Sequence, residues 1–292
     1  MIYHAKKSLS QNFLKSKPAL EMMIKAGEVD DNDIILEIGP GKGALTSKLL
    51  EKAKKVIAVE KDSSLIRMLE EKFKNEIKNK KLILINEDIL KFKFPLPFTR
   101  GGLGRGELID PLCPSGISPL SRGRGINEYK IIANIPYNIT GAIIKKFLSG
   151  ENQPSVMILL VQKEVADRIT ARSNKESILS LSVKAYGTPK YVMKVGKRFF
   201  SPSPKVDSAI ISIKDISRKN FKTPSEEEQF FKIIKSAFAH KRKVLRKNLE
   251  EVASLETIDF MFAKLGINQK IRAEDVPFTQ WLSISRYLSE NA

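Results

Sequence analysis

The sequence is poor in the residues that build disulfides and metal centres. Its 292 residues include one cysteine, Cys113, and two histidines, His4 and His240. One cysteine cannot form a disulfide within the chain, which fits a reducing cytoplasm. These three residues are also too few for a zinc site of the usual ligand set. We therefore expect a cytoplasmic protein without a metal. With two histidines, it has few candidates for histidine acid–base catalysis.

Long apolar runs are also missing. No segment approaches the roughly 18 consecutive apolar residues that a membrane helix needs. The first residues, MIYHAKKSLSQNF, lack the apolar core of a secretory signal. We therefore expect no membrane association. The length favours one large and one small domain, and we expect a monomer.

Acidic residues are too few to balance the basic ones. Lysine and arginine number 51 against 33 acidic residues, a net charge of +18, and the sequence pI is about 9.8. A solvated basic surface is the simplest explanation, but an excess of this size more often indicates a polyanionic partner, because each neutralised phosphate releases counterions. Charge alone does not choose between DNA, RNA and an anionic membrane.

Short apolar segments alternate with amphipathic ones over the first two thirds of the chain. We predict strands at 33–39, 55–60, 81–88, 129–134 and 155–162, and helices at 16–29, 44–53, 63–74, 140–149 and 163–169. Ser16 and Asp62 are expected to cap two of these helices. Such alternation is typical of a parallel sheet with helices on both faces, whose ligands bind beyond the carboxyl ends of the strands.

Two regions depart from this alternation. In segment 94–128, seven of 35 residues are glycine and five are proline, so we interpret it as a disordered surface insertion. Its four arginines resemble RNA-binding tails, although an insertion without function is the simpler interpretation. After about residue 223, helical stretches at 226–252, 255–266 and 279–291 predict a small all-helical domain with Trp281 in its core. We place the domains at 1–216 and 217–292.

A glycine-rich turn follows the first of these strands. In LEIGPGKGALT, Gly39, Gly41 and Ala44 satisfy the pattern G-x-G-x-x-G/A, and Glu60 lies 21 positions after Gly39, at the end of the next strand. Glycines let the backbone approach a ligand, and a carboxylate at that strand end can accept hydrogen bonds from both ribose hydroxyls. Strand, turn, helix and acid together predict an adenosine-containing ligand.

Two further carboxylates refine the prediction. Glu37 precedes the glycines inside the strand, where it would repel a pyrophosphate but suit a cationic amino group. S-adenosylmethionine carries such a group and no phosphate. Asp88, after the third strand, could accept a hydrogen bond from an adenine amine, and its alternative role is a helix or turn cap.

The stretch IIANIPYN, 131–138, ends the fourth strand beside this predicted site. In an arbitrary protein Asn-Ile-Pro-Tyr would be a turn, since a residue before proline adopts extended geometry. Here the position at a strand end beside the predicted ligand favours a catalytic role. The same chain carries a series of further motifs in order over nearly its whole length: QNFL (11–14), EIGPGKGALT (37–46), VEKD (59–62), NED (86–88), QKEVADRI (162–169), FFSPSPKVDSA (199–209), FAHKRKVLRKNL (238–249) and RAED (272–275).

With these motifs the chain resembles the ribosomal RNA adenine dimethyltransferases, which methylate two neighbouring adenines near the 3′ end of small-subunit rRNA. The resemblance implies a class I methyltransferase, Rossmann-like α/β fold with a mostly parallel seven-stranded sheet. It also implies S-adenosylmethionine as the cofactor and the rRNA of an immature small ribosomal subunit as the partner. The insertion 94–128 departs from the family pattern but replaces no motif.

The resemblance assigns roles to individual residues. Asn12 and Leu14 would close over the cofactor, Gly39 would lie along its methionine part, Glu60 would hold the ribose, Asp88 the adenine, and Asn134 would serve cofactor and substrate. Exocyclic N6 of adenine is a poor nucleophile, because its lone pair is delocalised into the ring. The side-chain oxygen of Asn134 and the carbonyl of Ile135 or Pro136 could accept its two N–H bonds.

Aromatic side chains would hold the base. Tyr137 could stack on one face of the adenine and Phe200 could cover the other, with stacking worth about 1–3 kcal/mol per base. Paired phenylalanines such as Phe199 and Phe200 are more often core residues, so for Phe200 the two interpretations are evenly balanced.

The basic run AHKRKVLRKNL is predicted to bind RNA phosphates. It places five cations within about two turns of the predicted helix, and in a chain this basic they favour phosphate contacts over a merely solvated face. These residues are Lys241, Arg242, Lys243, Arg246 and Lys247.

Three other functions remain alternatives. A related large-subunit methyltransferase of the macrolide-resistance type shares most motifs, although the tail FAHKRKVLRKNL…RAED resembles the small-subunit group better. A ribosome-assembly factor without catalysis would share the fold, but the intact Asn134, Tyr137, Glu60 and Asp88 argue against it. A nicotinamide dehydrogenase is disfavoured by Glu37 and by the lack of an evident hydride-transfer acid.

Overall fold

The fold is described from a computed structural model, which covers residues 11–93, 129–240 and 242–291. The predicted insertion 94–128 lies outside the described residues, and so does Lys241 of the predicted RNA-binding set.

Seven strands form one sheet in the order β4-β3-β2-β5-β6-β9-β7. Strands β2 to β6 run parallel to one another, whereas β9 is antiparallel to both β6 and β7. The predicted mostly parallel seven-stranded sheet is therefore confirmed. The strands are β2 (Ile34–Ile38), β3 (Lys55–Glu60), β4 (Leu82–Asn86), β5 (Tyr129–Asn134), β6 (Val156–Gln162), β7 (Thr188–Val195) and β9 (Ser208–Lys214).

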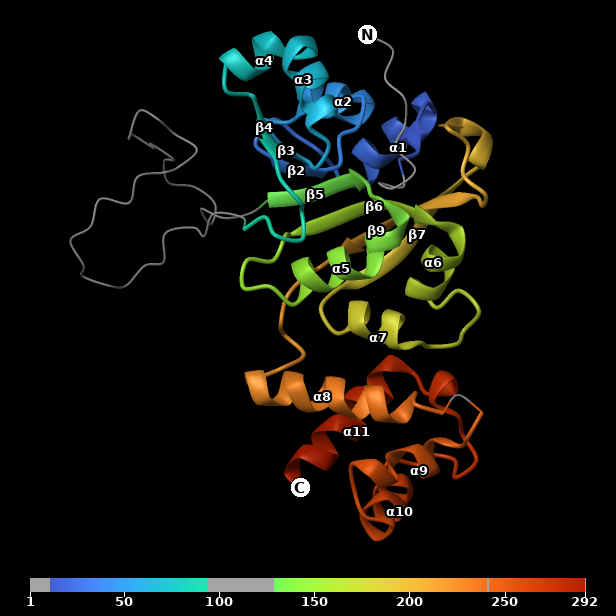
Figure 1. The fold of residues 1–292 in the computed structure, drawn as a ribbon. Coiled ribbons are helices and arrows are strands. Elements are labelled where there is room, and N and C mark those ends of the chain that lie inside the picture. Colours follow the sequence, from blue (N-terminus) through green and yellow to red (C-terminus); the bar gives the residue numbers. More distant parts are fainter. Residues whose placement is uncertain (1–10, 94–128, 241, 292) are drawn as a thin grey trace, which may run out of the picture.

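Helices cover both faces of the sheet (Figure 1). On one side lie α1 (Lys17–Ala26), α2 (Ala44–Lys52), α3 (Ser63–Lys72) and α4 (Lys74–Lys78), and on the other α5 (Thr140–Leu148), α6 (Lys163–Ile169) and α7 (Ile178–Lys184). Successive strand residues alternate between the two apolar layers, so that Ile35 packs with α1 and α2 while Leu36 packs with α5. Burial on both faces explains why these strands are continuous apolar runs.

Both predicted helix caps are present. The Ser16 hydroxyl accepts a hydrogen bond from the backbone N–H of Ala19 (3.3 Å) at the start of α1. The Asp62 carboxylate accepts one from the N–H of Ser64 (3.0 Å) at the start of α3. Each cap satisfies a backbone donor that the helix itself cannot pair.

Several elements with weaker sequence patterns were not predicted. Strand β7 is at the edge of the sheet, where Pro189 is tolerated because it has no ladder hydrogen bond to lose there. A second sheet pairs two very short strands, β1 (Phe13–Leu14) and β8 (Phe200–Ser201). Helix α7 was also missed.

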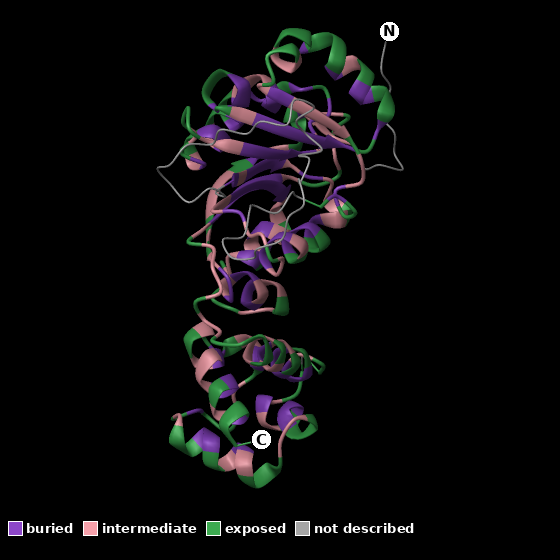
Figure 2. Ribbon diagram, turned by 90° about the vertical axis from the view of Figure 1, so that its left-hand side faces the viewer, coloured by how far each residue is buried: buried purple, intermediate pink, exposed green. Residues whose placement is uncertain are grey.

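The C-terminal part is helical and lies beyond α7 (Figures 1 and 2). It contains α8 (Pro224–Ala237), α9 (Leu245–Asn248), α10 (Leu255–Lys264) and α11 (Phe278–Glu290), with short 3-10 turns η4 (Leu249–Glu251) and η5 (Ala273–Asp275). Trp281 is buried, as predicted. Its apolar cluster is continuous with the one beneath the sheet, so the domain boundary at 216/217 stays a prediction.

The single helix predicted over 226–252 is wrong. Helix α8 ends at Ala237 and the chain turns before α9 begins at Leu245. The Asn248 side chain donates hydrogen bonds to the carbonyls of Ala237 (2.7 Å) and His240 (3.2 Å). It thereby satisfies carbonyls that a continuing helix would have paired internally. None of the helices in the described ranges combines the length and apolar character needed to cross a bilayer.

Candidate active site

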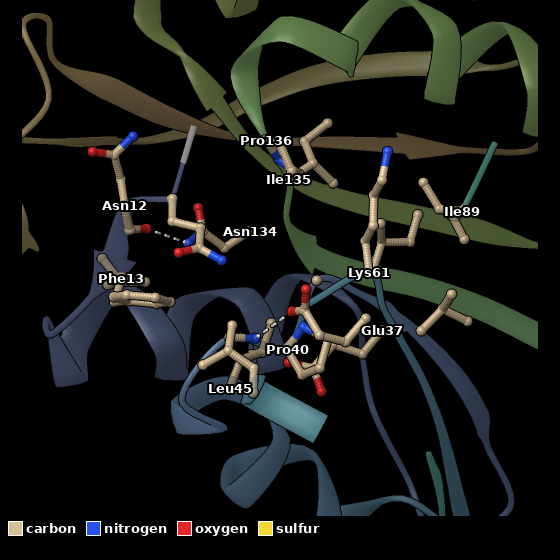
Figure 3. A pocket seen from close by; sticks show the side chains of 18 of the residues that line it. Asn12, Phe13, Glu37, Pro40, Leu45, Lys61, Ile89, Asn134, Ile135 and Pro136 are labelled. Atoms are coloured by element: carbon tan, nitrogen blue, oxygen red, sulfur yellow. Dashed lines mark hydrogen bonds between the residues drawn. The ribbon is translucent and has the colours of Figure 1, made fainter. Parts of the chain in front are cut away.

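The carboxyl ends of four neighbouring strands form one cavity of about 310 Å³ (Figure 3). Strand β4 leads to Asp88, β3 ends at Glu60, β2 leads into the glycine turn, and β5 ends at Asn134. All four positions line the cavity. Residues spread over almost a hundred positions of sequence therefore meet at one edge of the sheet, as parallel strand ends must.

The turn after β2 requires glycine at several positions. Gly39, Gly41 and Gly43 have φ values of +66°, +59° and +73°, in the left-handed region that side chains disfavour. A Cβ atom on Gly41 would lie 2.8 Å from the ring of Phe13, and one on Gly43 would lie 2.6 Å from the ring of Phe73. The backbone can thus pass close to the cavity only because side chains are absent.

Glu60 ties the glycine turn to the end of β3. Its Oε2 accepts a hydrogen bond from the backbone N–H of Gly41 (3.2 Å), and its Oε1 accepts one from that of Asp62 (2.9 Å). The side chain is 7% exposed, and burial raises its pKa although both backbone bonds oppose this. The carboxylate is thus held in place with lone pairs left for hydroxyl donors.

Glu37 is the most unusual side chain of the cavity. It is 1% exposed, it lines the cavity, and its Oε2 has no hydrogen-bond partner among the described residues. Burial raises its pKa to about 8. A buried carboxyl oxygen without a partner is costly, and it indicates a site that receives a cationic or hydrogen-donating ligand.

Asp88 is the turn cap that the sequence offered as one of its two roles, and its contact with an adenine amine stays a prediction. Its Oδ1 accepts a hydrogen bond from the backbone N–H of Leu90 (3.0 Å), which is the turn cap. Its Oδ2 pairs with Nζ of Lys61 (2.9 Å), and this hydrogen bond is the main reason that its pKa is lowered. The carboxylate also borders the cavity, where its remaining lone pairs can accept from an amine.

The end of β5 is fixed by the N-terminal segment. The Asn134 side-chain N–H donates to the carbonyl of Asn12 (3.0 Å; Figure 3). This bond sets the amide orientation and leaves Oδ1 without a partner among the described residues. The Pro136 carbonyl accepts from the N–H of Ile139 (3.3 Å), whereas the Ile135 carbonyl makes no such bond within the described ranges. Of the two carbonyls left open by the sequence, that of Ile135 is the freer acceptor.

The two aromatic candidates are placed differently. Tyr137, in the 3-10 turn η2 (Tyr137–Ile139), lines the cavity, and its hydroxyl lies 2.6 Å from that of Ser208. Burial raises its pKa. Phe200 is only 3% exposed, packs in the core and does not line the cavity. The structure therefore does not place Phe200 over a base, and its substrate contact stays a prediction. Its neighbour Phe199 is the exposed one, because Phe200 takes the inward position opposite Leu14 in the short ladder.

Several cavity residues were not singled out from the sequence. Phe13 packs on the glycine turn, with Nζ of Lys42 5.1 Å from its ring centroid, and Lys61 pairs with Asp88. Leu14 lines the cavity as predicted. QNFL and VEKD contained Phe13 and Lys61, but only the fold brings these motifs together.

The predicted RNA-binding residues do not share one helical face. Arg242 and Lys243 are exposed in the turn after α8, and Lys247 is exposed on α9. Arg246 instead makes two hydrogen bonds of 2.6 Å to the carboxylate of Asp259 on α10. The prediction that all of them belong to one basic helix is therefore wrong for the described residues, and Arg246 instead braces two helices. No group of three or more histidine, cysteine or acidic residues in the described part is arranged to hold a metal ion.

Comparison with known proteins gives consistent matches over nearly the whole chain. The family model described as "Ribosomal RNA adenine dimethylase" matches residues 2–290. A protein of Fusobacterium nucleatum named "Ribosomal RNA small subunit methyltransferase A" is 36% identical over 288 residues, which cover 97% of each chain. A protein of Dehalococcoides mccartyi with the same name is 33% identical and covers 98% of this chain and 89% of its own.

Two solved structures show the same fold. A dimethyladenosine transferase from Plasmodium falciparum gives a TM-score of 0.74 at 24% identity, covering 95% of this chain and 98% of its own. The 23S rRNA methyltransferase ErmE gives 0.73 at 22% identity, covering 95% and 100%. At these identities the likeness concerns the architecture, which is that of class I methyltransferases.

Proposed function

Because the chain belongs to the ribosomal RNA adenine dimethylase family, we propose that it dimethylates the N6 amines of two adjacent adenines near the 3′ end of small-subunit rRNA. The methyl donor is S-adenosylmethionine, and the substrate is the rRNA within an immature small ribosomal subunit. The observation that carries the proposal is that one cavity holds both the buried Glu37, whose Oε2 has no hydrogen-bond partner among the described residues, and the amide oxygen of Asn134.

The chemistry of the cavity fits S-adenosylmethionine. The buried Oε2 of Glu37 lacks a partner, and the amino group of the methionine part supplies one. Glu60 has lone pairs for the ribose hydroxyls, and Asp88 has them for the adenine amine. A pyrophosphate would meet Glu37 and Glu60 in the buried part of the cavity, whereas the lysines that line the cavity are exposed at its edge, so a dinucleotide fits poorly. Gly39 and Gly41 would hold the methionine part, with Asn12 and Leu14 covering it.

The chain's own residues would prepare the nucleophile. S-adenosylmethionine, when bound, supplies a methyl group on positively charged sulfur. Asn134 Oδ1 and the Ile135 carbonyl accept the two N–H bonds of adenine N6, which draws the nitrogen toward tetrahedral geometry and localises its lone pair. Pro136 has no N–H, so no competing donor stands in that position. Tyr137 stacks on the base, which must leave its helix to reach the cavity.

No strong base is required for this reaction. The amine nitrogen becomes acidic once it carries the additional methyl group, and its proton can pass to water. The main catalytic contribution is orientation of the nitrogen along the line of transfer. The scarcity of histidine in the sequence is therefore compatible with catalysis.

The small-subunit substrate is favoured over the large-subunit alternative. The relatives at 36% and 33% identity carry small-subunit names, whereas the likeness to a 23S enzyme at 22% identity concerns the fold alone. We further propose that exposed Arg242, Lys243 and Lys247, together with Lys241, contact RNA phosphates, and that the protein acts in the cytoplasm as a monomer.

Small subunits isolated without the modification provide the test. They are incubated with the protein and labelled S-adenosylmethionine, and the methylated nucleotides are mapped. Dimethylation of two adjacent adenines near the 3′ end of the small-subunit rRNA is expected. Transfer to large-subunit RNA, or to neither, would refute the assignment. Asn134→Ala should abolish turnover while the melting temperature stays close to that of the parent protein.

A further inference from the structure

An exposed phenylalanine with a guanidinium group against its ring stands next to the cavity. Phe199 is 37% exposed, and the guanidinium carbon of Arg198 lies 5.0 Å from its ring centroid. Arg198 makes no ion pair among the described residues. Within the described ranges the only other phenylalanine as exposed is Phe260, 63% exposed on α10 in the C-terminal helices.

The backbone places the Phe199 ring at the rim of the cavity. Its carbonyl accepts a hydrogen bond from the N–H of Lys15 (2.8 Å), and both Lys15 and Ser201 line the cavity. Phe200, which lies between Phe199 and Ser201 in the chain, is extended (φ −115°, ψ 158°) and buried. Phe199 ends the 3-10 turn η3 (Lys197–Phe199) and is 37% exposed, so its ring lies outside the core that holds Phe200, while Ser201 lines the cavity. Two extended residues span only about 7 Å.

The loop that carries this pair is fixed by its own hydrogen bonds. The N–H of Lys197 donates to Oδ1 of Asp207 (3.0 Å), and the Ser203 hydroxyl donates to the Lys197 carbonyl (3.0 Å). The Asp207 carboxylate also pairs with Lys194 (2.9 Å). Gly196 lies close to the aromatic ring, since a Cβ atom built on it would be 3.8 Å from two ring carbons. The ring is therefore presented from a loop with little freedom to turn it inward.

The nucleotide next to the target adenine needs a new stacking partner. When one of two adjacent adenines enters the cavity, its neighbour stays covalently attached at the rim and loses a stacking contact. Phenyl rings and guanidinium planes both stack on bases, without regard to base identity. We propose that Phe199 and Arg198 form a stacking platform for the nucleotide beside the adenine being methylated. The proposal rests on the proposed function, and it makes both residues positioning residues for the substrate.

The test compares Phe199→Ala with Phe260→Ala, which removes a more exposed ring on α10, far from the cavity. Initial rates are measured with unmethylated small subunits at saturating S-adenosylmethionine, together with subunit dissociation constants from filter binding. We expect Phe199→Ala to raise KM and the dissociation constant about tenfold, as for one lost base–aromatic stack. Cofactor affinity should be unchanged, kcat should change less than KM, and Phe199→Trp should restore KM. Phe260→Ala should match the parent.

The outcomes separate this platform from the proposed function. Equal KM and dissociation constants for Phe199→Ala and Phe260→Ala would overturn the platform while leaving the methyl transfer intact. Failure of Phe199→Trp to restore KM would also overturn it, because any large aromatic ring can stack. If the parent protein methylated no subunit, the proposed function would fail, and the difference in dissociation constant between the two alanine variants would still decide whether the platform exists.

Discussion

Replacing Glu37 by glutamine tests the buried acid that distinguishes this cavity. The change removes the titration of a group with no hydrogen-bond partner for its Oε2 and keeps the shape of the side chain. If Glu37 receives a cationic group of the cofactor, the variant should bind S-adenosylmethionine more weakly. Its affinity should also lose the pH dependence of the parent.

The size of this dependence follows from the raised pKa. Burial raises the pKa of Glu37 from 4.5 to about 8, so in the ligand-free protein about one molecule in ten carries the carboxylate at pH 7. A ligand that requires the charged form must first drive off the proton. The affinity of the parent should therefore rise about tenfold per pH unit below pH 8 and level off above it.

Stability should change in the opposite direction. Between pH 4.5 and about 8 the folded chain holds a proton on Glu37 that the unfolded chain has released. The free energy of unfolding therefore falls as the pH rises through that window. Glutamine does not titrate, so the variant should gain stability over the parent with rising pH, by at most roughly 3 kcal/mol at pH 7.

Calorimetry measures the effect on binding, and urea unfolding measures the effect on stability. Titrations with S-adenosylmethionine in buffers of different ionisation enthalpy give the number of protons released, which should approach one at pH 7 for the parent and zero for Glu37→Gln. Urea unfolding at pH 5 and pH 8 gives the stability difference. The control is Glu70→Gln, an exposed acid on α3. Binding by the parent with no proton release and no slope between pH 6 and 8 would refute the reasoning.

Two matched pairs of variants test other parts of the site. Arg242→Ala should lower the slope of log K against log salt for rRNA binding by about one unit. Arg246→Ala should leave that slope unchanged and lower the melting temperature, because its guanidinium is bound to Asp259. Filter binding over a salt series gives the slopes and thermal melts give the melting temperatures; equal slopes for the two variants would show that the assignment is wrong. Gly41→Ala should weaken cofactor binding, since a Cβ atom there meets an aromatic ring at 2.8 Å and φ is +59°. Gly141→Ala, which has open space around it, should keep cofactor affinity and stabilise α5 by about 0.5–1 kcal/mol; calorimetry that gave equal affinities for the two would contradict the strain argument.

The parallel part of the fold could be predicted because its signals are local. Strands buried on both faces are continuous apolar runs, and a glycine turn between strand and helix is visible in a dozen residues. The positions that line the cavity follow each strand directly, so knowing that the strands are parallel neighbours was enough to bring Glu60 and Asn134 together. Edge strand β7 carries no such run, since it is only partly buried and contains Pro189.

The features that could not be predicted depend on contacts between residues distant in the sequence. The run of cations after α8 has the spacing of a helix. In the structure, however, the Asn248 side chain binds the end of α8, and Asp259 on α10 binds Arg246. Both contacts join residues that are separated by a turn of the chain. The same applies to the paired phenylalanines. Which of Phe199 and Phe200 faces inward depends on the register with β1, and no local pattern encodes that register.

The charges of the cavity explain how one strongly basic protein can serve two ligands of opposite sign. Its buried acids, Glu37 and Glu60, form the floor, whereas the lysines that line it, Lys15, Lys42 and Lys61, are exposed at its edge. Glu37 is largely protonated at pH 7 and ionises most readily beside a cation, whereas a phosphate in the floor would meet carboxyl groups and no cation. The exposed lysines act on a polyanion within a Debye length of about 8 Å. Under the proposed function, the floor thus favours a cationic cofactor over the RNA backbone, and the rim attracts that backbone.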